Sequence, residues 1–184
     1  MLAATDGESW RSATLFEPPL VTPQAMRDPV ARAGTEARVA GARRRRRAWA
    51  SPTALFDRLR ADRAYQGIAD DVLHDHVAAV LTRQADGSFE LRCTPETEAA
   101  VYEAVASTDP FERLDRLSAP AHFVASAPPS NWLSEVQPLA AARARGTWEG
   151  LAETSHFLPL ERPEACAAII RRQVALTADC SLPA

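Results

Sequence analysis

The sequence predicts an α/β protein in which a short parallel sheet is interrupted by a long helical insertion. Two short apolar runs are typical of buried strands and a third run gives a weaker strand signal, and each of the three is followed by sequence with helical character. The first two runs are separated by residues 20 to 121, which read mostly as helix. Strands that are joined through helices usually lie parallel in one sheet. We therefore expect residues 1–24 and 118–184 to form the core and residues 25–117 to form the insertion.

The first strand is expected in the run Ala13-Thr-Leu-Phe-Glu-Pro-Pro-Leu20, ending at Glu17. Proline disfavours helical backbone in the residue before it and lacks an amide proton, so Pro18 closes the strand.

The insertion contains several helices with recognisable starts. Ser51 and Pro52 form a typical helix start, with serine as the N-cap and proline at the first helical position. A second helix is predicted over residues 70–82, where apolar residues repeat with helical spacing. A turn over residues 85–88 precedes an extended segment. Two further helices are expected over residues 96–107 and 111–117.

After the insertion, two more strands and two helices are predicted. The strands are residues 121–127 and 147–152. Because proline is favoured in the first turn of a helix, the intervening helix is expected to begin near Pro138 and to run to Arg145. The last helix is predicted from Pro163 to about Leu176.

Composition excludes several classes of protein. A formal charge of −3 argues against a chain that binds nucleic acid over its whole surface. Three cysteines without metal-like spacing indicate free thiols in a reducing compartment. The first residues lack a basic segment and a long apolar segment, so we expect no signal peptide, and no apolar run is long enough for a membrane span. These features predict a cytoplasmic protein that requires neither a membrane nor nucleic acid.

One histidine lies where catalytic groups collect in α/β proteins. His156 follows the third predicted strand and precedes a helix that begins with proline. Loops at the carboxyl ends of parallel strands commonly carry active sites. Imidazole titrates near neutral pH, so it can take a proton from a nucleophile and return it to a leaving group.

The run from His156 to Glu164, His-Phe-Leu-Pro-Leu-Glu-Arg-Pro-Glu, resembles the closing motif of the α/β-hydrolase family. By this resemblance the chain corresponds to the C-terminal portion of such an enzyme: strands six to eight of the sheet, with the insertion as a helical cap or lid. The cap sequence, with its arginine-rich stretch and Trp49, looks like caps in bacterial members. The resemblance implies that His156 is the general base, that the substrate is a small organic ester or a similar molecule, and that no cofactor or metal is needed.

The resemblance leaves two positions open for the acidic partner of His156. Glu17 lies at the end of the first predicted strand, as in the subset of the family whose acid follows strand six, such as haloalkane dehalogenases. Many members instead place the acid after the next strand, where Glu135 is the nearest carboxylate.

The nucleophile of the family is not found in this sequence. The family presents it on a tight turn, usually Gly-x-Ser-x-Gly. Only Gly146 and Gly150 among the seven glycines are four residues apart, and Trp148 lies between them. We therefore expect the nucleophile, serine or aspartate, upstream of Met1, and little hydrolysis from this chain alone. A non-catalytic interaction or regulatory protein built on the same remnant is the alternative. In either case the first strand would have an unpaired edge, which favours pairing with another chain as a homo-oligomer.

Two further patterns receive weaker interpretations. The run from Arg43 to Arg47 could bind nucleic acid, but a solvated helix is favoured because the whole chain is acidic. His74 and His76 are two residues apart and so face different sides of a helix, which does not suit a metal site.

Overall fold

The computed structural model describes residues 10–108, 110–129 and 131–178. The chain divides into two compact units. The first, here called the sheet unit, contains residues 1–24 and 109–184, and the second, the helical unit, contains residues 25–108.

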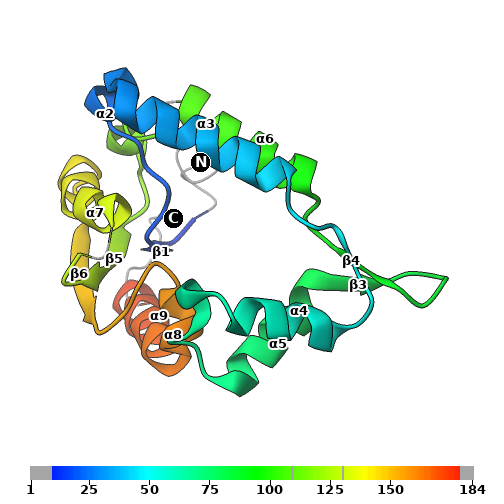
Figure 1. Cartoon of the computed structure of the whole chain (residues 1–184). Coiled ribbons are helices and arrows are strands. Elements are labelled where there is room, and N and C mark those ends of the chain that lie inside the picture. The colour runs from blue at the N-terminus through cyan, green and yellow to red at the C-terminus, as the bar shows by residue number, and fades with distance from the viewer. Residues whose placement is uncertain (1–9, 109, 130, 179–184) are drawn as a thin grey trace. The chain divides into compact units, whose positions relative to one another are not determined.

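The sheet unit is built on three parallel strands in the order β1-β5-β6 (Figure 1). All three predicted strands are present, two of them with the predicted bounds. Leu15 pairs with Phe123 across the first ladder, and Phe123 pairs with Trp148 across the second. Among the described residues, no strand pairs with the other edge of β1. The strands are β1 (Ala13–Phe16), β5 (Ala121–Ala127) and β6 (Thr147–Ala152).

Helices cover both faces of this sheet. Successive strand residues point to opposite sides, so apolar side chains lie on both faces and are buried by helices. Phe123 faces α7 and is fully buried in a cluster with Leu20 and Val136. Its neighbour Val124 faces the other way and packs with Leu158 and with Ile169 of α9. The helices are α7 (Trp132–Arg143), α8 (Leu158–Glu161) and α9 (Pro163–Ala178).

Strand β6 is held close to β5 by a glycine. A Cβ atom on Gly146 would lie 2.2 Å from the backbone oxygen of Ala121, so only glycine fits where α7 turns into β6. Gly150, four residues later, is likewise tight, because an added Cβ would lie 2.7 Å from the Cβ of Ala127. Gly146 and Gly150 are therefore four residues apart because both pack closely against β5.

The helical unit pairs two long helices, α3 and α6, which run side by side (Figure 1), and adds a small antiparallel sheet in the order β2-β4-β3. The Ser51 hydroxyl accepts a hydrogen bond from the amide of Ala54 at 3.1 Å, which confirms the predicted N-cap. The elements are α2 (Pro23–Arg27), α3 (Pro29–Arg43), β2 (Ala48–Trp49), α4 (Pro52–Arg60), α5 (Asp70–Val80), β3 (Leu81–Arg83), β4 (Phe89–Leu91) and α6 (Pro95–Ser107), with a 3-10 turn at Arg63–Tyr65.

The predicted start of α7 was wrong. The helix begins at Trp132 rather than near Pro138, because the side chain of Asn131 accepts a hydrogen bond from the amide of Leu133 at 2.7 Å and caps the helix earlier. Pro138 then lies inside the helix, where the side chain of Gln137 donates to the carbonyl of Leu133 at 2.7 Å.

The second boundary of the insertion also differs from the prediction. Residues 109–117, assigned to the insertion from the sequence, belong to the sheet unit. The reason is apolar packing: Leu114 is buried in the same cluster as Phe123, with Phe111 and Leu117 against it. The expected helix there is a single 3-10 turn, Leu114–Arg116.

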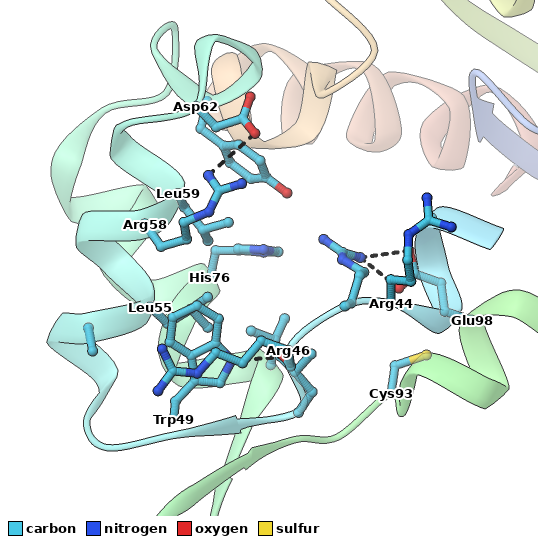
Figure 2. Close-up of a pocket in the computed structure, with 16 residues that line it drawn as sticks. Arg44, Arg46, Trp49, Leu55, Arg58, Leu59, Asp62, His76, Cys93 and Glu98 are labelled. Carbon is cyan, nitrogen blue, oxygen red and sulfur yellow. Dashed lines mark hydrogen bonds and ion pairs between the residues drawn. The ribbon is translucent and has the colours of Figure 1, made fainter. Parts of the chain in front are cut away.

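The prediction of a solvated helix for the arginine run was wrong. Only Arg43 belongs to α3, and residues 44–47 form the connection between α3 and β2 (Figure 2). The third cysteine, Cys180, lies outside the described residues. Cys93 and Cys166 are free thiols. Within the described ranges, no helix is long and apolar enough to cross a membrane.

Candidate active site

Glu17 sits at the carboxyl end of β1 in an unusual environment for a charged group. Its exposed fraction is 1%, and its φ angle of 37° lies in the left-handed region that non-glycine residues seldom adopt. Its amide donates a hydrogen bond to the carbonyl of Val124 at 2.9 Å, which holds this backbone against β5. Strained backbone of this kind persists where surrounding contacts determine it, and such positions cluster at functional sites.

The carboxylate of Glu17 is surrounded by donors. Its Oε1 accepts a hydrogen bond from the amide of Ser126 at 2.8 Å and another from the hydroxyl of Ser134 at 2.5 Å. Its Oε2 lies 2.8 Å from Nδ1 of His156. The two serine hydroxyls are themselves 2.6 Å apart. A buried carboxylate is costly unless it is hydrogen-bonded, and this one is bonded through both oxygens.

The charge state of Glu17 follows from these contacts. Burial alone would raise the pKa of the carboxyl, but the hydrogen bonds, first that of His156 and then those of the two serines, lower its pKa from 4.5 to about 2. The group is therefore ionised at neutral pH and can only accept hydrogen bonds.

That charge state determines the tautomer of His156. Because an ionised Glu17 only accepts, Nδ1 must carry the proton and donate it to Oε2. In the neutral imidazole the lone pair is then on Nε2. Nε2 makes no hydrogen bond to any of the described residues, and 48% of the side chain is exposed. The ring thus presents a proton-accepting nitrogen at the surface, with its other nitrogen anchored in the core.

The loop that carries His156 is shaped by a neighbouring carboxylate. It joins β6 to α8, and the carboxylate of Glu161 at the end of α8 accepts from the Ser155 amide at 2.6 Å and from its hydroxyl at 2.7 Å. The Ser155 hydroxyl in turn accepts from the amide of Phe157 at 3.3 Å. The backbone before His156 is therefore tied to Glu161 directly, and the backbone after it is tied to Glu161 through the Ser155 hydroxyl.

Glu17, Ser126 and His156 lie at the carboxyl ends of β1, β5 and β6, which meet at one edge because the strands are parallel. The structure brings together the two residues that the sequence singled out. It does not bring the alternative acid to the site: Glu135 is exposed in the first turn of α7 and makes no bond to His156.

Solved structures of hydrolases share this architecture. The chain superposes on a peroxisomal alpha-beta-hydrolase from Saccharomyces cerevisiae with a TM-score of 0.73 and 14% identity, covering 98% of this chain and 50% of that one. It matches E-2-(acetamidomethylene)succinate hydrolase with a TM-score of 0.68 and 15% identity, over 92% of this chain and 59% of the other.

The chain has part of the α/β-hydrolase fold, consistent with the C-terminal portion of such a protein. An esterase of M. tuberculosis, at a TM-score of 0.66 and 21% identity, is covered over 57% of its length by 95% of this chain. The chain thus spans about half to three fifths of the α/β-hydrolase structures that it matches. No protein-family model matches the sequence, and no curated protein matches it.

Sequence reasoning missed the two serines that hold Glu17 in this α/β-hydrolase fold. Ser126 lies in the apolar strand β5, and Ser134 lies in α7, whose start was misplaced. A lone serine in either setting carries no local signal, since its partner lies more than a hundred residues earlier in the chain.

Two of the other histidines have structural surroundings. His122 is buried, with Nδ1 at 2.8 Å from the Thr147 hydroxyl and Nε2 at 3.1 Å from Glu149, as expected for a hydrogen-bonded core histidine. His74 stacks on Phe56 with ring centroids 4.0 Å apart. Within residues 10–108, 110–129 and 131–178, no cluster of three or more His, Cys, Asp or Glu side chains could hold a metal.

Proposed function

We propose that Glu17 and His156 are the acid and the base of a hydrolase active site that acts on an ester or a similar bond in a small organic substrate. The observation that carries the proposal is the buried carboxylate of Glu17, bonded at 2.8 Å to Nδ1 of a histidine whose Nε2 is open. The fold supports it, because enzymes of this fold are among its structural neighbours.

In the proposed reaction, His156 Nε2 removes the proton of a nucleophile as the nucleophile attacks the carbonyl carbon of the substrate. The proton is then given to the leaving-group oxygen when the carbon–oxygen bond breaks. Glu17 holds the ring in the required tautomer and stabilises the imidazolium that forms. Water repeats the cycle in the second half of the reaction.

The nucleophile would come from outside these 184 residues, since the sequence contains no Gly-x-Ser-x-Gly. It would enter at the edge of β1 that is unpaired among the described strands. A parallel strand added there would end beside Glu17, at the edge where the loop of His156 also lies. A serine there would give its proton to His156 as described, whereas an aspartate has no proton to give, so with aspartate His156 would act only on the water that hydrolyses the ester intermediate. The chain alone is expected to hydrolyse little.

The test is to isolate the protein from its own cells, measure its intact mass, and assay hydrolysis of p-nitrophenyl acetate. A mass above 20.0 kDa with activity that His156→Ala abolishes is the expected result. Glu135→Gln, which removes an exposed carboxylate of α7, is the matched control and should retain activity. Equal activity of His156→Ala and wild type would refute the assignment.

The missing Gly-x-Ser-x-Gly motif and the edge of β1 that no described strand pairs with also support one alternative. A chain of 20.0 kDa without a nucleophile would use the edge of β1 that no described strand covers to pair with a partner strand, as a non-catalytic interaction protein. An intact mass near 20.0 kDa and no hydrolysis would favour this alternative over the enzyme.

A further inference from the structure

The ring of His156 depends on its loop for its position. The side chain is 48% exposed, so burial does not fix it. One hydrogen bond, 2.8 Å from Nδ1 to Oε2, joins it to Glu17. A single bond orients a ring only when the backbone that carries the ring is already in place, because catalytic groups must be held within about 0.5 Å of their working geometry. The loop of residues 153–157, which joins β6 to α8, therefore decides whether His156 meets Glu17.

The ends of this loop are attached by contacts that lie away from His156. Leu158, at the start of α8, is fully buried in a cluster with Val124 of β5. The carboxylate of Glu153 pairs with Arg162 at 3.1 Å. This ion pair contributes little, because 84% of the Glu153 side chain is exposed. These contacts set the path of the chain into and out of the loop but do not hold the residues directly beside His156.

The carboxylate of Glu161 makes contacts that do hold them. One of its oxygens accepts from the Ser155 amide at 2.6 Å, and the other accepts from the Ser155 hydroxyl at 2.7 Å. The same hydroxyl accepts from the amide of Phe157 at 3.3 Å. Hydrogen bonds to a carboxylate are roughly twice as strong as those between neutral groups. The residue before His156 is thus bonded to Glu161 twice, and the residue after it is reached through the serine hydroxyl.

We propose that Glu161 is a positioning residue for the hydrolysis described above, and that it acts on His156 through Ser155. By holding the loop, Glu161 keeps Nδ1 of His156 within reach of Glu17 and leaves Nε2 free to take the proton of the nucleophile. The catalytic meaning of this role rests on the proposed function. The position of the ring can be measured without it.

Nitrogen-15 NMR of the histidine rings in the 184-residue chain tests the proposal. The chemical shifts of the two ring nitrogens report which of them carries the proton, and His156→Gln identifies the signals of His156. For the neutral ring of wild type, we expect the proton on Nδ1, where an ionised Glu17 accepts it. In Glu161→Ala, the ratio of the Nδ1–H to the Nε2–H tautomer should fall about tenfold, the factor for one lost hydrogen bond to a charged group.

Variants of Ser155 separate the hydroxyl bridge from the rest of the contact. Ser155→Ala keeps the amide bond to Glu161 but loses the hydroxyl that accepts from Phe157, so the tautomer ratio should fall by less, about threefold. Ser155→Thr keeps a hydroxyl and should retain the wild-type ratio. Glu164→Ala, which removes an exposed carboxylate from the first turn of α9, is the matched control and should also leave the ratio unchanged.

His122 reports in the same spectra whether the sheet unit stays folded. It lies in β5 and both its ring nitrogens contact side chains of β6, so its signals should match wild type in every variant. An unchanged tautomer ratio in Glu161→Ala, with unchanged His122 signals, would overturn the proposal. If Glu161→Ala altered the His122 signals as well, equal ratios in Ser155→Ala and Ser155→Thr would overturn it instead.

Hydrolysis by the protein expressed in its own cells separates this role from the proposed function. In Glu161→Ala, kcat should fall about ten- to a hundredfold with KM little changed, because a misplacement of about 1 Å in a catalytic group can cost about a hundredfold. A changed tautomer ratio with unchanged hydrolysis would refute His156 as the base and leave the structural contact in place. Hydrolysis that His156→Ala abolishes, with neither the ratio nor kcat changed in Glu161→Ala, would refute the positioning role alone.

Discussion

The acid stability of the sheet unit should depend on one carboxylate, Glu17. Its pKa is lowered from 4.5 to about 2, which corresponds to about 3 kcal/mol of stabilisation at neutral pH. A group whose pKa is lowered by folding stabilises the fold above its unfolded pKa, and that stabilisation is lost as the pH falls. About 2 kcal/mol should therefore disappear between pH 7 and about pH 3, and the remainder below pH 3.

The variant Glu17→Gln separates this effect from that of other carboxylates. Glutamine keeps an oxygen that can accept from Ser126 and Ser134 but has no charge to lose. The stability of the variant should therefore change less than that of wild type between pH 7 and pH 3. At neutral pH it should be about 2–3 kcal/mol less stable than wild type, in the range for lost hydrogen bonds to a charged group.

Hydrogen exchange of the amides in β5, measured by mass spectrometry, is a suitable assay because it reports on the sheet unit alone. Wild type and variant are compared at each pH, so the intrinsic dependence of exchange on pH cancels. Glu135→Gln controls for the loss of one negative charge. If wild type and Glu17→Gln lost the same opening free energy between pH 7 and pH 3, the argument from hydrogen bonding of Glu17 would be wrong.

Three other expectations follow from the structure. Ser134→Ala should destabilise the sheet unit by about 1–3 kcal/mol, because it removes a 2.5 Å bond to the buried carboxylate of Glu17; an unchanged exchange rate in β5 would contradict this. Gly146→Ala should lower the melting temperature, because the added Cβ would lie 2.2 Å from a backbone oxygen. Gly41→Ala should instead raise the stability by about 0.5–1 kcal/mol, because Gly41 lies in the helix α3 and the added Cβ would have no atom within 4 Å. The 184-residue chain should elute in size-exclusion chromatography as an oligomer or be poorly soluble, because one edge of β1 is unpaired among the described strands; a sharp monomer peak with cooperative melting would refute this.

Short-range signals in the sequence were sufficient for most of the elements. The strands β5 and β6 have their predicted bounds: β5 is a buried apolar run bordered by proline, whereas β6, which is mostly exposed, is marked off by Gly146. The Ser51 cap and the last helix from Pro163 were likewise readable, since capping acts within one turn. The start of α7 was misjudged because the local preference of Pro138 for a first turn was outweighed by the cap at Asn131.

The sequence by itself also determined two candidate residues, Glu17 and His156, because each follows a strand in a recognisable setting. It did not determine that they meet, nor that two serines share the carboxylate. Those contacts join residues 109, 117 and 139 positions apart. Only tertiary structure could decide them, because local preferences act over a few residues, whereas the meeting of the strand ends depends on how the whole sheet pairs.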